Sequence, residues 1–329
     1  MNRSKLLTGA LVIVLVLLAG GSWLLFGSST GLNLANADQY TAGDTNLSSP
    51  VENLDIDWTS GKVNIEYHAG SGVSVSETAN REMSGDEKLR WWLDGSTLRV
   101  RYCKSGLNIR INLTKTLTIS LPEGTVLKKA DIDVTSADVD VPKLDADEVR
   151  FDSTSGNINA EISTKKLDAS STSGDMVIRQ NGAINNAVLG STSGNISFYA
   201  PSAETVDMKS TSGGLGITVS GNVQKLHLNS TSGTILADLV SADKAEFDST
   251  SGNMDVTLQS FQNLDLDATS GNITLKLPNA PGFTLDLDAK PRNFSNSLSM
   301  EKDGSKYTYG DGSARLRIET TSGEIRIEN

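Results

Sequence analysis

The chain is poor in the residues from which most reactive and metal-binding sites are built. Its 329 residues include one cysteine and two histidines, with no CxxC pair, which excludes an internal disulfide and leaves no zinc-binding pattern. The single thiol, Cys103, is predicted to be buried and structural. Aromatic residues make up only 5% of the chain, as expected of a core built from narrow aliphatic layers. A formal charge of −11 argues against nucleic acid as a partner, because the phosphate backbone attracts basic proteins.

What the chain has in abundance is the triplet Thr-Ser-Gly, which recurs ten times with small variations. The central serines are Ser60, Ser136, Ser155, Ser173, Ser193, Ser212, Ser232, Ser251, Ser270 and Ser322. From Ser136 to Ser270 they follow one another at steps of 18 to 20 residues. A constant step of this size is typical of a solenoid, in which each repeat is one coil resting on the previous one.

Apolar residues alternate with other residues on both sides of each triplet. Counted from the central serine, they occupy positions −6 and −4 and then +3 and +5, as in Leu264, Leu266, Ile273 and Leu275. Each half is therefore a strand with one buried face, and the change from even to odd positions requires a corner. The sequence predicts an all-β fold: a single-stranded parallel β-solenoid of about 19-residue coils, preceded by one N-terminal transmembrane helix.

Two sets of small residues are predicted to build the corners. The glycine at position +1 is predicted to turn the chain by adopting a positive φ. These turn glycines are Gly61, Gly156, Gly174, Gly194, Gly213, Gly233, Gly252, Gly271 and Gly323. The serines at position −2 are predicted to stack inside the rod as a ladder of hydroxyls, and they are Ser153, Ser171, Ser191, Ser210, Ser230 and Ser249.

The amino terminus has the pattern of a membrane anchor. Residues 6–26 carry no charge and are long enough to span a bilayer as a helix. Arg3 and Lys5 precede this stretch and no basic residue follows before Lys62, which places the rest of the chain outside the cell. The rival interpretation is a cleaved signal peptide with an A-x-A site at Ala35-Asn36-Ala37, eleven residues past the apolar stretch. The distance favours an uncleaved anchor, hence a single-pass protein of the cell membrane with an extracytoplasmic C-terminal domain.

Four regions follow from these patterns. Residues 1–27 form a cytoplasmic tip and the anchor, and residues 28–48 form a flexible linker. Residues 49–130, where the period lapses, are predicted to form an N-terminal β cap and the first coils. Residues 131–329 are predicted to hold the solenoid repeats, with a looped excursion at 278–314 before a last coil that closes the carboxyl end.

Together these features resemble those of a bacterial β-strand-repeat family known as "putative adhesins", which includes LiaG-like and YvlB-like envelope proteins. The resemblance rests on the repeated Ser-Thr-Ser-Gly-Asn-Ile units, on Leu54-Asp-Ile-Asp-Trp-Thr-Ser-Gly-Lys-Val, and on the ending from Pro281 to Ile327. It covers residues 50–329. It implies a bacterial surface or envelope protein with relatives encoded beside envelope-stress signalling systems, and it supplies no catalytic residues.

Carboxylates are the residues that raise the question of catalysis. Asp131, Asp133, Asp138 and Asp140 cluster in one coil, and paired carboxylates can cleave glycosidic bonds. They alternate with valine and isoleucine as in an ordinary half-buried strand, and the nearly constant coil length leaves no loops to wall a cleft. Of the histidines, His227 lies at position −5, between inward-facing leucines, and is predicted to point to solvent.

A calcium site is a weaker prospect. Asp152, Asp248 and Asp267 share position −3, and oxygen-rich turns bind hard cations. Serine, glycine, lysine and asparagine interrupt this column in the other coils, so no metal-binding, cofactor-binding or catalytic residue is predicted.

The sequence thus predicts a membrane-anchored, extracytoplasmic solenoid that is a non-catalytic binding or structural module of the bacterial cell envelope, in adhesion or envelope stress. The alternative is a polysaccharide-active β-helix enzyme. The membrane is the expected partner of the N-terminal helix. For the rod the partner classes are a cell-wall polymer, an envelope protein or a cationic peptide, and not nucleic acid.

Overall fold

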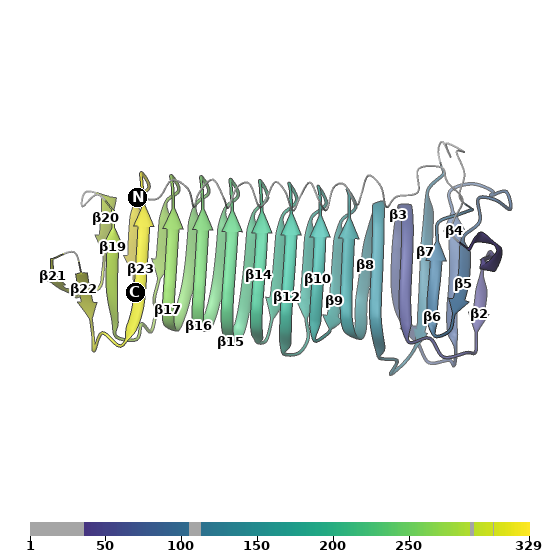
Figure 1. Ribbon diagram of the computed structural model, residues 1–329, viewed down its shortest axis with the longest axis horizontal. Helices are drawn as coiled ribbons and strands as arrows, with labels where there is room; N and C mark the ends of the chain where they lie inside the picture. The colour runs from purple at the N-terminus through teal and green to yellow at the C-terminus, as the bar shows by residue number, and fades with distance from the viewer. Residues whose placement is uncertain (1–35, 105–112, 290–292, 305) are drawn as a thin grey trace.

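The computed structural model describes residues 36–104, 113–289, 293–304 and 306–329, and it shows an elongated rod of stacked strands (Figure 1). The described residues form strands except for loops and one 3₁₀ turn, Ala37–Gln39, which confirms the all-β prediction. The predicted anchor, residues 6–26, lies outside the described residues. Within the described ranges no helix is long and apolar enough to cross a membrane.

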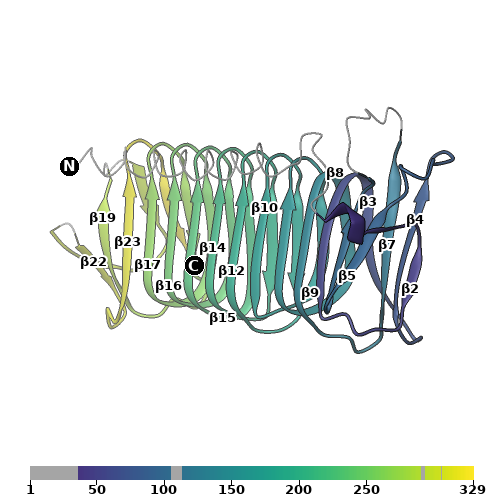
Figure 2. The same ribbon diagram turned by 45° about the vertical axis from the view of Figure 1, so that its right-hand side comes forward.

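Parallel coils that lie one on another build the centre of the rod (Figure 2). Its strands are β8 (Leu127–Ser153), β9 (Ile158–Ser163), β10 (Lys166–Ser171), β11 (Met176–Gln180), β12 (Ile184–Ser191), β13 (Ile196–Ala200), β14 (Ala203–Ser210), β15 (Leu215–Ser230), β16 (Ile235–Ser249), β17 (Met254–Ala268) and β18 (Ile273–Lys276). Neighbouring coils pair in register, so that Ser171 lies beside Ser191, and Ser191 beside Ser210. The repeat in the sequence is therefore a repeat in space.

The rod has two long faces, which we name by their place relative to the Thr-Ser-Gly corners. The leading face consists of β10, β12, β14 and the parts of the longer strands that precede a corner. The trailing face consists of β9, β11, β13 and the parts that follow a corner. The apolar residues of both faces point inward and form one continuous hydrophobic core, as the period-two pattern predicts.

The corner glycines are required for a reason other than the predicted one. Of the nine predicted turn glycines, only Gly61 has a positive φ. In the others the backbone lies against the carbonyl oxygen of the corresponding corner residue in the preceding coil. A Cβ on Gly252, for example, would overlap the carbonyl oxygen of Gly233. The positive-φ prediction is wrong for these eight, and the glycines form a ladder in which each corner can approach the next only because no side chain intervenes.

The serines at position −2 close the corners from the inside. All six are at most 7% exposed. The hydroxyls of Ser153, Ser171, Ser230 and Ser249 donate to the carbonyl oxygen of the glycine three residues later, at 2.6 to 2.9 Å. Such a bond stabilises the fold by about 1 kcal/mol and leaves no polar group unpaired at that point of the core.

Asparagine and aspartate side chains join the coils along the rod. The side-chain oxygen of Asn157 accepts the backbone N–H of Asp175 at 3.0 Å, Asp175 accepts that of Asn195 at 2.7 Å, and Asn195 accepts that of Gly214 at 2.8 Å. Asparagine and aspartate also suit the turn itself. Because these residues follow the corner glycines, their side chains also bind the backbone of the next coil.

The amino-terminal end is built out of sequence order. Its strands are β1 (Thr41–Ala42), β2 (Thr45–Leu47), β3 (Asn53–His68), β4 (Val73–Ala79), β5 (Arg90–Asp94), β6 (Thr97–Arg101) and β7 (Lys115–Pro122). Strand β3 pairs with β8 on one side and with β6 and β7 on the other, so the later segment lies farther out. Strands β4 and β5 then run antiparallel to β7 and β6 and cover the end. Cys103, expected to be buried, is half-buried here against the core.

A buried charge pair lies inside this cap. The Lys115 ammonium is 2.6 Å from a Glu77 carboxylate oxygen, and both side chains are almost completely buried. The ammonium also lies over the rings of Trp58 and Tyr102, 4.8 and 4.2 Å from their centroids. Loss of one partner of such a pair costs about 3–5 kcal/mol, so the pair holds β4 against β7, and the contact with Trp58 joins both to β3.

The carboxyl-terminal end repeats the same plan. Its strands are β19 (Phe283–Asp288), β20 (Phe294–Asn296), β21 (Glu301–Asp303), β22 (Lys306–Tyr309), β23 (Ala314–Thr320) and β24 (Ile325–Glu328). Strand β23 lies between β17 and β19, and β24 lies between β18 and β20. The prediction that the last coil closes the rod is therefore wrong, because the excursion lies outside it. The antiparallel strands β22 and β21 follow β19, so a hairpin covers the edge that a parallel stack would otherwise leave open.

Candidate functional site

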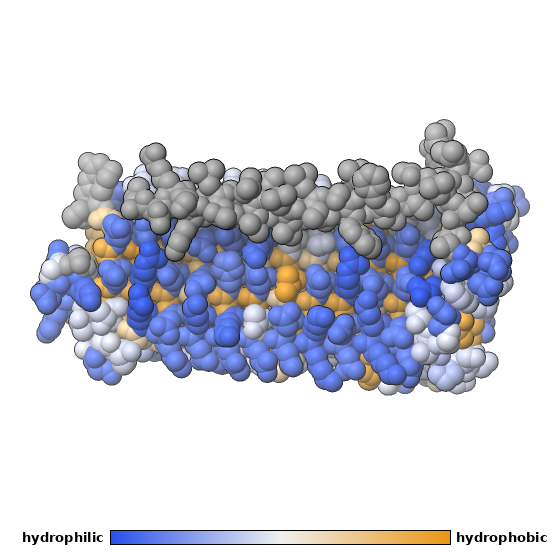
Figure 3. All heavy atoms as spheres, in the orientation of Figure 1, coloured by the Kyte–Doolittle hydropathy of each residue, from blue (hydrophilic) through white to orange (hydrophobic). Residues whose placement is uncertain are grey.

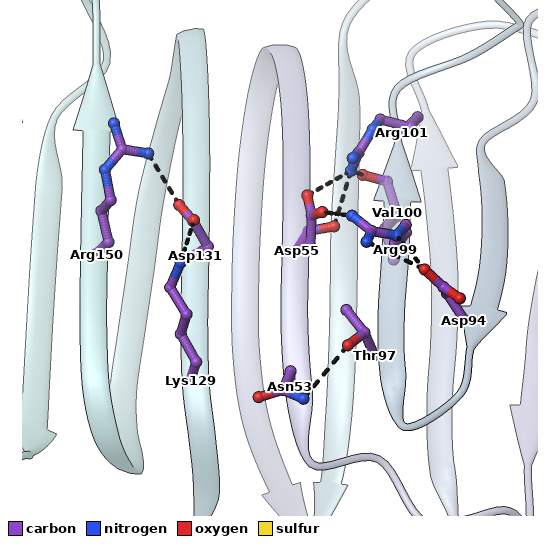
Figure 4. A network of polar contacts seen from close by, with 10 residues as sticks. All are labelled: Asn53, Asp55, Asp94, Thr97, Arg99, Val100, Arg101, Lys129, Asp131 and Arg150. Atoms are coloured by element: carbon purple, nitrogen blue, oxygen red, sulfur yellow. Dashed lines mark hydrogen bonds and ion pairs between the residues drawn. The ribbon is translucent and has the colours of Figure 1, made fainter. Parts of the chain in front are cut away.

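The charged side chains of the leading face pair with one another. Figure 3 shows this face, on which hydrophilic side chains predominate. In Figure 4, Asp55 lies between Arg99 and Arg101, and Asp131 lies between Lys129 and Arg150. The Arg150 guanidinium is 3.0 Å from Asp131, and the Arg101 guanidinium is 2.8 Å from Asp55. These pairs join neighbouring coils, whereas Asp133 lies beside the carboxylates of Asp57 and Asp152 and has its pKa raised to about 6 by burial and by their charges.

His227 belongs to this network. Its side chain is 33% exposed and points outward as predicted, but it lies between two carboxylates of neighbouring coils. Nδ1 is 3.2 Å from Asp207 and Nε2 is 3.1 Å from Asp248. Hydrogen bonds to Asp207 and to Asp248 raise the pKa of His227 to about 9, so the ring is a cation at neutral pH. It acts as a bridge between coils and has no open position for substrate.

The carboxylates considered for glycosidic cleavage do not converge. Asp131 and Asp133 lie on the leading face, whereas Asp138 and Asp140 follow the corner and lie on the trailing face. Asp140 is 2.9 Å from the Lys62 ammonium, and Asp138 accepts a backbone N–H at 2.9 Å. Across the described ranges no group of three or more histidine, cysteine, aspartate or glutamate residues is placed to hold a metal ion. The aspartates of position −3 thus form no cation site there.

The trailing face carries an open groove with a volume of about 390 Å³, which we call the trailing-face groove. It crosses the central coils of the rod, from β13 to β18. The residues that line it are Ser197, Tyr199, Gly216, Ile217, Thr218, Leu236, Ala237, Asp238, Asp255, Thr257 and Lys276. The predicted turn glycines and stacked serines lie elsewhere, at the corners.

A glycine makes the floor of the groove. Gly216 lies on β15 between Ser197 of β13 and Leu236 of β16. A Cβ at this position would meet its nearest atoms at 3.6 Å, which is an ordinary contact, so the fold does not require a glycine here. The missing side chain leaves a depression between its two neighbours.

An aromatic and an aliphatic side chain stand beside this floor. Tyr199 is 39% exposed, and the Arg179 guanidinium lies over its ring at 5.1 Å from the centroid. Leu236 is 53% exposed, whereas the other leucines named in the core are buried. Both project from outward positions of the sheet, where most other coils carry polar residues.

The polar groups of the groove lie along its far side. Lys276 reaches back to Asp255 of the preceding coil, with the ammonium 3.2 Å from a carboxylate oxygen. Asp238 is exposed, lies two residues from Leu236 on the same face, and pairs in register with Thr218 and Thr257. The groove thus offers an aromatic ring, an aliphatic side chain, hydroxyls and a carboxylate on one surface. Neither histidine nor cysteine lines it. These groups suit recognition of a ligand and include no nucleophile paired with a base.

Sequence reasoning missed this site, although a signal was present. Positions +4 and +6 were treated only as outward positions. Most coils carry polar residues at these positions, but three neighbouring coils carry Tyr199, Gly216 and Leu236 there. Gly216 and Leu236 share position +4, and Tyr199 is at position +6 of the coil before Gly216. A missing side chain beside exposed large ones is the pattern that could have revealed the groove.

The comparison with protein families decides the classification. A family model described as Toastrack DUF4097 matches residues 51–263 and again residues 161–328. The chain belongs to the Toastrack family. The double match reflects the repeat, since one coil of a Toastrack protein can be aligned with another. The result agrees with the resemblance to adhesin-type envelope proteins drawn from the repeats.

Two solved structures from Parabacteroides species are similar to this chain at low identity. A "putative adhesin" from Parabacteroides merdae ATCC 43184 shares 11% identity with this Toastrack chain, with a TM-score of 0.48, over 88% of this chain and 96% of that one. A "putative lipid binding protein" from Parabacteroides distasonis ATCC 8503 shares 16% identity over the same shares of the two chains, with a TM-score of 0.42. A search of curated proteins finds no match. At these identities and TM-scores, neither structure indicates what this chain binds.

Proposed function

We propose that this Toastrack protein is a non-catalytic binding module of the bacterial cell envelope and that its partner contacts the trailing-face groove. The observation that carries the proposal is the contrast between the two faces. Ion pairs such as Arg150 with Asp131 hold many charges of the leading face, whereas the groove exposes Tyr199 and Leu236 beside Asp238. Exposed apolar groups beside unpaired polar ones are typical of a recognition surface.

Tethering to the membrane is part of the proposal. The uncharged stretch at residues 6–26, preceded by Arg3 and Lys5, supports a single-pass anchor with the rod outside the cell. The prediction of a flexible linker over 28–48 is wrong for residues 41–47, because β1 pairs with β5 and β2 with β4 in the cap. Only the part of the linker before β1 would then set how far the rod stands from the membrane. Protease added to intact cells should digest an epitope tag at the carboxyl terminus, and protection of that tag would contradict the orientation.

A capture experiment tests the binding function. Full-length protein in mild detergent is mixed with purified wall sacculi, with membranes and with a cationic antimicrobial peptide, at low and high salt. We expect saturable capture by one of them, and loss of that capture in Leu236→Ser. The matched control is Val188→Ser, since Val188 is 40% exposed on the leading face. Equal loss in both variants, or no capture at all, would contradict the assignment of the groove.

A role in envelope stress is the narrowest part of the proposal, supported by the resemblance alone. Deletion of the gene should increase sensitivity to antibiotics that act on the wall or on membrane lipids. Complementation with Leu236→Ser should fail to restore resistance, whereas Val188→Ser should restore it. Unchanged growth of the deletion strain would remove this part and leave the binding function open.

A further inference from the structure

The trailing-face groove has the shape of a track along the rod and not of a closed pocket. From Ser197 to Lys276 its lining residues cross five neighbouring coils, linked by the parallel pairing of β13, β15, β16, β17 and β18. At about 4.8 Å per coil this distance is about 19 Å. A linear chain can occupy such a track over several of its units.

The side chains of the groove restrict the chemistry of that chain. The groove has no enclosed apolar volume into which an acyl chain could withdraw from water. It lies on a sheet face whose backbone groups are already paired, so a peptide cannot add to it as a strand. Asp238 and Asp255 repel polyanions, whereas Lys276 is occupied by Asp255. Two classes remain, namely a cationic peptide, which the same carboxylates attract, and a chain rich in hydroxyls and free of phosphate. The tyrosine ring and the threonine hydroxyls of the groove favour the second class.

The pair formed by Leu236 and Asp238 narrows this class. A plain hexose chain could place an apolar ring face against Tyr199 and its hydroxyls against Asp238 and the threonines. It would leave Leu236, which is 53% exposed, uncovered. An acetamido group supplies a methyl for the leucine and an N–H donor for a carboxylate on the same side of the chain. Leu236 and Asp238 are two residues apart in one strand and so present these two surfaces side by side.

We infer that the trailing-face groove binds a chain of N-acetylated amino sugars that lies along the rod, with Tyr199 as the stacking platform and with Leu236 and Asp238 contacting the acetamido group. This inference rests on the proposed binding function and specifies its ligand class.

Two oligosaccharides of equal length test the inference. Chitohexaose and cellohexaose have the same backbone linkage and differ at the acetamido group. They are titrated into the full-length protein in mild detergent by isothermal calorimetry. We expect chitohexaose to bind at least about tenfold more tightly than cellohexaose, because the loss of apolar and hydrogen-bonded contacts is worth one order of magnitude or more.

The matched variants are Gly216→Val and Gly190→Val. The first fills the floor of the groove, where a Cβ has only ordinary contacts, and should weaken chitohexaose binding by at least about tenfold. The second adds the same side chain to the leading face, where nothing lies within 4 Å of a Cβ, and should leave binding unchanged. Circular dichroism spectra of both variants should match that of the unmodified protein.

The outcomes separate the two proposals. Equal affinity for both sugars would overturn the acetamido assignment. If sacculi are captured but chitohexaose neither binds nor competes for that capture, the amino-sugar inference is overturned and the binding function stands. Failure to bind either sugar or any envelope component would overturn both.

Discussion

The leading and trailing faces are made by one repeat, yet their outward side chains are used in different ways. On the leading face most outward residues are charged, and ion pairs such as Arg150 with Asp131 join one coil to the next. On the central part of the trailing face, the outward residues are small, hydroxyl-bearing or apolar, and Gly216 leaves a groove among them. The strand pairing is the same on both faces. The fold therefore leaves the outward columns free to vary, and a ligand site can arise on a regular sheet without any inserted loop.

The largest effect is expected at the corners, which both faces share. Gly252→Val would force a side chain against the carbonyl oxygen of Gly233, and we expect a loss of about 3 kcal/mol in stability through overpacking. Gly190→Val on the leading face and Gly216→Val on the trailing face should each change stability far less. Thermal unfolding followed by circular dichroism compares the three variants. Equal melting temperatures in all three would show that the corner glycines are not needed for close stacking.

The corners and the faces also differ in how much of their structure can be predicted from the sequence. The regular step between serines and the alternation of apolar residues predict the coils, because a buried face imposes a period of two on any strand. The reason for the corner glycines was not predictable in the same way, since it lies in the distance to the next coil. The order of the strands at the carboxyl-terminal end was not predictable from the sequence either. β19 pairs on the outer side of β23, although it comes before β23 in the chain. The groove depends on Tyr199, Gly216 and Leu236, which lie far apart in the chain and become neighbours only when the coils stack.

His227 allows the leading-face network to be tested by pH. Because its pKa rises from 6.5 to about 9 on folding, its contribution to stability is fully present below pH 6.5 and is lost as the pH rises through 9. His227→Gln should therefore lower stability by about 1 kcal/mol at pH 6, after allowance for solvent screening, and by almost nothing at pH 10. Denaturant unfolding at both pH values gives the difference between variant and unmodified protein. A difference that grows with pH would contradict the carboxylate bridge.

One position of the leading face is expected to gain from losing its charge. Burial, followed by the charges of Asp57 and Asp152, raises the pKa of Asp133 to about 6. The ionised form is thus disfavoured in the folded protein, and the stability present at low pH is lost as the pH rises through 6. Asp133→Asn should raise stability by about 1 kcal/mol at pH 8, with the gain fading towards pH 4. Destabilisation at pH 8 would show that the carboxylate is better satisfied than its neighbours suggest.

The smallest effect on stability is expected in the groove itself. Leu236 is exposed and forms no part of the buried core, so Leu236→Ser should alter the free energy of unfolding by less than about 0.5 kcal/mol. Val188→Ser should behave in the same way on the leading face, and the two variants should differ only in ligand capture. A loss of more than 1 kcal/mol in Leu236→Ser alone would mean that this leucine supports the coil below it. Such a result would make the trailing face a packing surface like the core and would remove the distinction between the two faces on which the binding site depends.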